Sequence, residues 1–175
     1  MFAVEPDGSF LGKLEGGGNL ALELEGVLDR LWIGDRLGES IRLENMGHAL
    51  LDKNEIHDAL QSYQQAIQIA DDISFPPVQN YARWGQALAH LYANDLPAAR
   101  AAIEEACRYD VPQNNHNVSA LWGVIALRQG EIETARAAFA QAIGMADAMI
   151  GHSAQNYDAW EAKGLALAGL ALVRY

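Results

Sequence analysis

The sequence predicts an all-α fold, a right-handed superhelical α-solenoid in which antiparallel helix pairs stack one on the next. Three observations predict it. Apolar residues recur at helical spacing in four segments, these segments repeat every 36 to 40 residues, and breaks containing Pro, Gly or Asn separate them. Together they predict about three and a half two-helix units, with about eight helices in all.

The helical period is clearest in the segment from Ile56 to Ala70. Its apolar residues recur at three- and four-residue intervals, which places them on one face of a helix. The same layout begins again at Leu96 and Ile132, and a weaker copy begins at Leu20. The equivalent positions are 39, 40 and 36 residues apart: Leu20, Ala59, Ala99 and Ala135. A recurrence of this length is typical of stacked two-helix units.

The chain begins outside this pattern, since residues 1–18 end in Gly16-Gly17-Gly18 and predict a flexible tail. The helical repeat domain is expected over 19–175, with a half repeat at 19–36, repeats at 39–72, 77–110 and 115–150, and a C-terminal helix at 154–174. Breaks are expected at Ile33–Arg36, Asp72–Pro77 and Asp110–Asn117. Short turns within the units predict antiparallel neighbours: Lys53–Glu55, Asn94–Asp95 and Gln129–Glu131.

Small and large residues follow a fixed order in each unit. The first helices carry Met46-Gly47, Trp84-Gly85 and Trp122-Gly123, and the second helices carry Ala59-Tyr63-Ala66, Ala99-Ile103-Ala106 and Ala135-Phe139-Ala142. Over roughly residues 19–173 these residues resemble the tetratricopeptide repeat family. The resemblance implies close helix contacts at Gly47, Gly123, Ala59, Ala99 and Ala135. One departure is the gap from Gly85 to Ala99, which is two residues longer than in the other units.

A narrower resemblance concerns the segment Ile33–Glu39, which is similar to the linker of the roughly 40-residue repeats of bacterial multidomain signalling ATPases. Tyr109–Gly130 and Tyr157–Leu172 are similar to the ends of such arrays. This resemblance implies a sensor or scaffold region, either detached or part of a longer chain.

The family resemblance also implies a concave groove, lined by the first helices, that binds a protein or peptide. Carried over to this sequence, its partner-binding residues are Asn45, His48, Asp52, Gln79, Arg83, Gln86, His90 and Arg128, with Glu44, Ala120 and Val124 beside them. Asn45 and Arg83 resemble part of a clamp for a peptide carboxylate, although Gln79 replaces its lysine. The alternative is an Asn and an Arg that are simply solvated.

Charge and motifs narrow the function class. The net charge is −11 and the 12 Lys and Arg residues are scattered, which disfavours nucleic-acid binding. The longest apolar run, Leu165–Val173, is too short for a membrane span, and no secretory leader begins the chain, so we expect a cytoplasmic protein. Neither metal-ligand spacing nor a phosphate loop is present, so we expect no metal, cofactor or catalysis. The alternative to a binding scaffold is a regulatory segment of a larger signalling ATPase.

The C-terminal helix has two apolar sides. The side with Tyr157, Trp160, Gly164, Leu167 and Ala171 is expected to pack on the preceding unit. The other side, with Ala162, Leu165, Gly169 and Leu172, has no second helix to cover it. We therefore expect either self-association through this stripe, as a homodimer, or a chain that natively continues.

Overall fold

The computed structural model describes residues 18–173, and every regular element among them is an α-helix. The seven helices are α1 (Gly18–Asp52), α2 (Ile56–Asp72), α3 (Pro76–Tyr92), α4 (Leu96–Ala106), α5 (Asn115–Arg128), α6 (Ile132–His152) and α7 (Tyr157–Leu172). The chain divides into two units, Met1–Asp35 and Arg36–Tyr175, and the packing described below lies within the second. None of the described helices is long and apolar enough to cross a bilayer.

Helix α1 corrects one sequence prediction, because it runs without a break through Ile33–Arg36. A single glycine inside a helix costs only about 1 kcal/mol, and no proline is present to stop the helix. Two expected helices are therefore one, and the described residues form seven helices rather than eight. Apart from Gly18, which begins α1, the predicted flexible tail lies outside the described residues.

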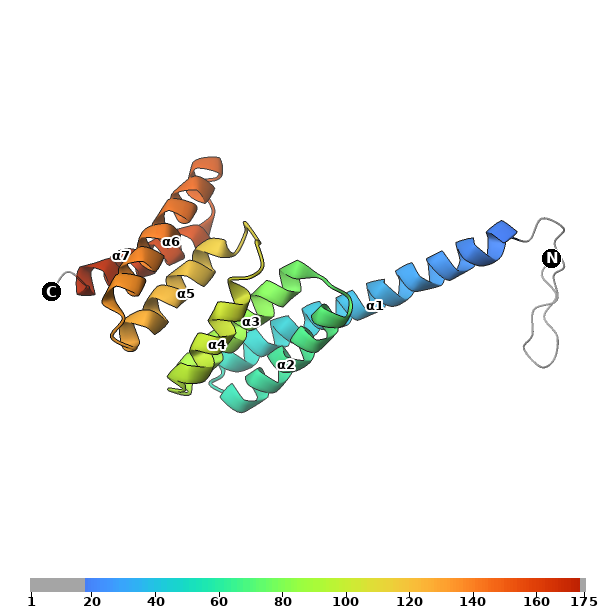
Figure 1. Cartoon of the computed structure of the whole chain (residues 1–175), viewed down its shortest axis with the longest axis horizontal. Helices are drawn as coiled ribbons and strands as arrows, with labels where there is room; N and C mark the ends of the chain where they lie inside the picture. Colours follow the sequence, from blue (N-terminus) through green and yellow to red (C-terminus); the bar gives the residue numbers. More distant parts are fainter. Residues whose placement is uncertain (1–17, 174–175) are drawn as a thin grey trace. The chain divides into compact units, whose positions relative to one another are not determined.

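Helices α1 and α2, α3 and α4, and α5 and α6 form the expected antiparallel pairs, and α7 follows the last pair (Figure 1). Within the pairs, the turns reverse at Asn54, Asn94 and Gly130, whose φ angles are 62°, 60° and 80°. Only Gly adopts this left-handed region freely, and Asn is the next most tolerant residue. Helix α4 then begins with a cap, in which the Asp95 side chain accepts a hydrogen bond from the Ala98 backbone N–H at 3.1 Å. The predicted all-α stack of helix pairs is confirmed.

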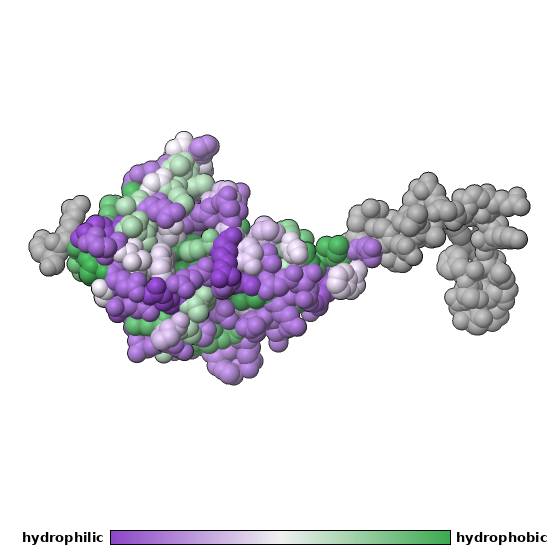
Figure 2. All heavy atoms as spheres, viewed as in Figure 1, coloured by the Kyte–Doolittle hydropathy of each residue, from purple (hydrophilic) through white to green (hydrophobic). Residues whose placement is uncertain are grey.

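The core is a row of three apolar clusters, each of which joins one helix pair to the next helix. The first lies between α1, α2 and α3 and includes Leu51, Ala59, Tyr63 and Val78. The second joins α3 and α4 to α5, and the third joins α5 and α6 to α7. Polar residues cover most of the described surface in the view of Figure 2, with apolar patches between them. Each helix pair is thus stabilised by packing against the neighbouring helices, as in other repeat folds.

Two aromatic rings fill the space between consecutive first helices. Tyr63 lies against Gly47 and Gly85, where an added Cβ would come within 2.5 Å of its ring. Phe139 lies in the same way against Gly123 and Gly169. Ala59, Ala99 and Ala135 are all 0% exposed, and Gly47 and Gly123 are buried. The predicted close contacts at these small residues are confirmed.

Helix α7 packs through a different face from the one predicted. Its buried residues are all small: Ala159, Ala162, Ala166 and Gly169. Val173, which follows the helix, is also buried. Gly169 therefore does not belong to an open stripe, because it lies against the Phe139 ring. Tyr157, Trp160 and Leu167, which were expected to pack inward, are exposed. The helices approach too closely for large side chains, so the alanine stripe determined which face is buried.

Candidate functional site

A groove runs along the first helices of the pairs. It has a volume of about 550 Å³, and its lining comes from α1, α3, α5 and α7 and from Asn114, the residue just before α5. The lining residues are Glu44, His48, Tyr81, Trp84, Leu88, Asn114, Asn117, Ala120, Leu121, Asp158, Glu161, Ala162 and Leu165. We call this the first-helix groove. It corresponds to the surface expected to bind a partner.

A second hollow of about 580 Å³ continues the groove toward the turn after α1. It shares His48, Trp84 and Leu88 with the first hollow and adds Leu51, Asp52, Asn54 and Tyr92. We include these residues in the first-helix groove.

Helix α3 supplies the aromatic side of the groove. Tyr81, Trp84, Leu88 and Tyr92 follow one another at intervals of three or four residues, so they form one stripe along the helix. Three of them are partly buried, and Tyr92 is 61% exposed. The stripe offers large, rigid side chains of the kind that anchor partners in protein interfaces.

The charged side chains that line the groove are all acidic. Glu44 and Asp52 come from α1, whereas Asp158 and Glu161 come from α7, and no Lys or Arg is among the lining residues. Burial raises the pKa of the Tyr81 hydroxyl, and the carboxylates of Asp158 and Glu44 raise it further. Carboxylates from both α1 and α7 therefore act electrostatically on the Tyr81 hydroxyl.

His48 connects the groove to the core. Its Nε2 lies 2.7 Å from the Glu44 carboxylate, and its Nδ1 lies 2.8 Å from the Tyr63 hydroxyl. Because a carboxylate only accepts, Nε2 carries the proton and donates to Glu44. Burial, followed by Glu44 and Asp52, raises the pKa of Tyr63, so its hydroxyl stays protonated where it hydrogen-bonds with Nδ1. The His48 ring also lies 5.6 Å from that of Trp84.

The structure brings only part of the predicted residue set into this groove. His48 and Asp52 line it, together with Glu44 and Ala120. Asn45 is exposed on α1 and lines neither hollow. Arg128 instead donates hydrogen bonds to the Leu91 carbonyl and the Asn94 side chain, at 3.3 and 2.5 Å. It therefore ties α5 to the turn between α3 and α4.

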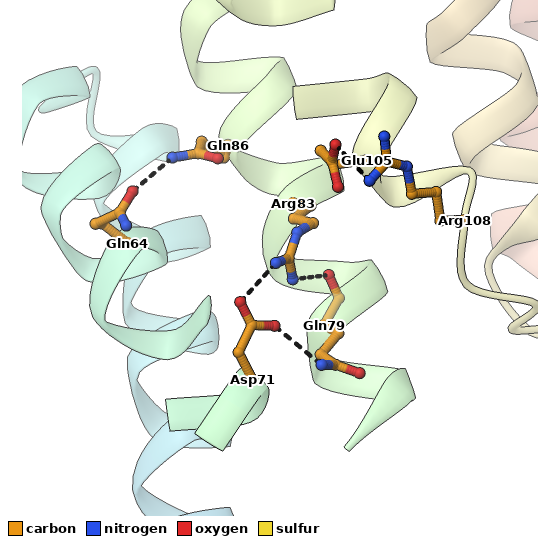
Figure 3. A network of polar contacts seen from close by, with 7 residues as sticks. All are labelled: Gln64, Asp71, Gln79, Arg83, Gln86, Glu105 and Arg108. Atoms are coloured by element: carbon orange, nitrogen blue, oxygen red, sulfur yellow. Dashed lines mark hydrogen bonds and ion pairs between the residues drawn. The ribbon is translucent and has the colours of Figure 1, made fainter. Parts of the chain in front are cut away.

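The four predicted residues of α3 lie on a different face of that helix. Arg83, Gln86 and His90 line a hollow between α2, α3 and α4. Figure 3 shows the polar contacts of Gln79, Arg83 and Gln86. Asp71 of α2 accepts from Arg83 at 2.7 Å and from Gln79 at 2.9 Å, and Gln86 donates to Gln64 at 3.2 Å. The prediction that these four residues of α3 line the first-helix groove is therefore wrong.

The longer gap between Gly85 and Ala99 explains why these residues of α3 were assigned to the wrong face. Ala87 lies 12 residues before Ala99, as Gly47 lies before Ala59 and Gly123 before Ala135. Ala87 is fully buried in the same cluster as Ala99, so it is the structural equivalent of those glycines. Counting from Gly85 instead misplaces the helix by two residues, which is about 200° of rotation.

The same alignment recovers the residues that the sequence prediction missed. Counted from Ala87, the positions of Glu44, His48 and Asp52 become Trp84, Leu88 and Tyr92. All six residues line the first-helix groove. The signal was therefore present in the spacing to the second helix, which fixes the register better than the Trp-Gly pair does.

No group of three His, Cys, Asp or Glu side chains suited to a metal ion occurs within the described part of the chain. The groove offers carboxylates and aromatic rings, which suit it to binding a cationic or amphipathic surface.

Comparisons with known proteins agree with this architecture. A sequence profile of the tetratricopeptide repeat matches residues 45–115 and 121–171. No curated protein matches the chain significantly. Among solved structures, the chain is similar to the C-terminal TPR-containing domain of a Plasmodium falciparum protein named as an FK506-binding protein, with a TM-score of 0.55 and 18% identity over 81% of this chain and 95% of that one. That likeness is one of fold. Since the profile covers more than half of the sequence, the chain belongs to the tetratricopeptide repeat family.

Proposed function

We propose that this chain is a non-catalytic scaffold that binds a segment of another protein in the first-helix groove. Tetratricopeptide repeats are generally interaction modules, and solenoids of this kind create extended binding surfaces. The observation that carries the proposal is the stripe of Tyr81, Trp84, Leu88 and Tyr92, which lines an open groove, although Trp84 and Leu88 also pack against the core. Of the residues predicted from sequence, His48 and Asp52 belong to the proposed site.

Site-specific photocrosslinking tests this placement. A photoreactive amino acid is introduced at Tyr81 or Tyr92 in the groove, and in parallel at Gln86 or His90 on the other face of the same helix. In an extract of the native host, we expect a protein to crosslink at the two groove positions and not at the two control positions. Crosslinking confined to Gln86 and His90 would move the site to the face between α2 and α4.

A second function, as a regulatory segment of a larger signalling ATPase that acts by interdomain packing or self-association, has one observation in its favour. The outer side of α7 exposes Tyr157, Trp160, Leu167 and Leu172, by 47 to 73%. An apolar surface of this kind at the end of an array suits a further domain or a second copy. Binding in the groove and packing through α7 use different residues, so one does not exclude the other.

A further inference from the structure

Elsewhere in the chain, cations, carboxylates and aromatic rings occur together in three-part clusters. Arg83 pairs with Asp71 at 2.7 Å and lies 5.2 Å from the Tyr109 ring. Arg100 pairs with Glu104 and lies 5.2 Å from the Trp122 ring. Lys163 pairs with Asp147 and lies 5.4 Å from the Trp160 ring. Each cation is held by charge on one side and by an aromatic face on the other.

The first-helix groove contains two of these three parts. Its aromatic rings are Tyr81, Trp84 and Tyr92, and its carboxylates are Glu44, Asp52, Asp158 and Glu161. Within the described residues, no Lys or Arg pairs with these acids or lies over these rings. Glu44 is bonded to His48, and the other three carboxylates have no ion-pair partner in the described structure. Among the described residues, the groove therefore has the carboxylates and the aromatic rings of such a cluster but no Lys or Arg to complete it.

We propose that the groove binds a cationic peptide segment, in which Arg or Lys side chains from the partner complete these clusters. The inference rests on the proposed function and specifies the partner's chemistry. An arginine lying on the Trp84 or Tyr81 ring would have acids within reach from both α1 and α7. Arg suits this site better than Lys, because its planar guanidinium both stacks on a ring and binds a carboxylate through two nitrogens.

We expect the partner segment to carry apolar residues between its cationic ones, because the groove also contains leucines. Leu88 of α3 and Leu165 of α7 line the same groove as the acids, and Leu165 is 47% exposed. A segment that alternates Arg or Lys with Leu, Ile or Val would bury these leucines while placing its charges against the acids. An acidic segment, or the phosphates of a nucleic acid, would be repelled by the same carboxylates.

Selection from a random dodecapeptide display library tests the proposal without assuming a partner. The target is the full chain, and the selected peptides are then measured by fluorescence anisotropy at low and high salt. A groove variant carries E44Q, D158N and E161Q. A matched control removes the same charge from exposed acids outside the groove with D58N, E104Q and E133Q.

We expect the wild-type chain and the control variant to enrich peptides rich in Arg and Lys. Their binding should weaken about tenfold in the groove variant, and also at high salt. Enrichment of neutral or acidic peptides, still lost when Tyr81 and Tyr92 are replaced by Ala, would overturn the cationic partner and leave the groove function standing. Peptides whose binding is unaffected by either set of groove substitutions would overturn both.

Discussion

Glycines inside these helices differ in what surrounds them. Gly123 faces the Phe139 ring, where an added Cβ would lie 2.4 Å from the nearest ring atoms. Gly144, in α6, has nothing within 4 Å of that position. The two residues therefore offer a matched pair for testing the close contact between helices.

Replacing Gly123 with Ala should lower the free energy of unfolding by about 1–3 kcal/mol, because the methyl group displaces a buried ring. Replacing Gly144 with Ala should raise it by about 0.5–1 kcal/mol, because Ala is the better helix former. Urea denaturation of both variants and the wild type measures the difference. A stabilising effect at both positions would contradict the packing of Phe139 against α5.

His116, in α5, is a histidine enclosed in the interior. It is fully buried, and neither ring nitrogen has a hydrogen-bond partner in the described structure. Burial lowers the pKa of His116, and nearby Asp158 opposes this only in part. The folded state therefore binds a proton less readily than the unfolded state, whose histidine pKa is about 6.5. Stability is fully present above that pH and is lost as the pH falls below it.

Denaturation at pH 7.5 and pH 5.5 should show this loss in the wild type and a smaller loss in a His116→Leu variant. The control is a His152→Leu variant, which replaces a histidine that is exposed instead of buried. Burial also lowers the pKa of His90, so part of the decline should remain in the His116 variant. The same decline in all three proteins would show that His116 does not titrate on unfolding.

At the scale of elements, a buried amide pair joins α3, α4 and α5. The Asn80 side chain donates to the carbonyls of Ala106 and Tyr109 at 3.0 and 3.2 Å, and the Asn114 side chain donates to Asn80 at 2.8 Å. The pair thus satisfies the end of α4 and fixes the loop before α5. Both asparagines are 0% exposed.

An Asn80→Ala substitution should cost about 1–3 kcal/mol, because it removes a hydrogen-bond donor from two carbonyls and an acceptor from the buried Asn114 amide. Hydrogen exchange over residues 107–114 should accelerate in the same variant. Replacing the exposed Asn45 with Ala should change stability by less than about 0.5 kcal/mol. Equal effects at the two positions would argue that Asn80 does not organise this joint.

The sequence allowed the helix pairs, their turns and their small-residue contacts to be predicted. The spacing of apolar residues and the Gly, Pro and Asn residues at the turns are local properties of the chain. It did not allow the continuity of α1 to be predicted, because a single glycine such as Gly34 is compatible both with a helix interior and with a break. The buried face of α7 was also missed. There the stripe from Ala159 to Gly169 is less hydrophobic than the Trp and Leu side chains beside it, and only the close approach to Phe139 selects it. The groove residues of α3 were missed because the Trp84-Gly85 pair was used to set the register, whereas the spacing to Ala99 in the second helix fixes it correctly.

At the scale of the whole molecule, the open side of α7 predicts self-association. Leu167 and Leu172, which are 50 and 69% exposed, lie outside the first-helix groove. A second copy using the same patch is the simplest cover for these side chains. Light scattering should show dimers of the wild type at high micromolar concentration and monomers of a Leu167→Glu, Leu172→Glu variant. Dimers that persist in that variant, or a monomeric wild type, would exclude this surface.

The two extra residues between Gly85 and Ala99 show how such an array can change what it recognises. A length change beside a turn presents another side of the helix to the groove, while small residues, here Gly85 and Ala87, keep contact with both neighbouring helices. Specificity can then evolve by insertion or deletion as well as by substitution, and in steps of about 100° per residue. An engineer could use the same route, exchanging the aromatic side of α3 for its Arg- and Gln-bearing side by removing two residues rather than by redesigning the surface.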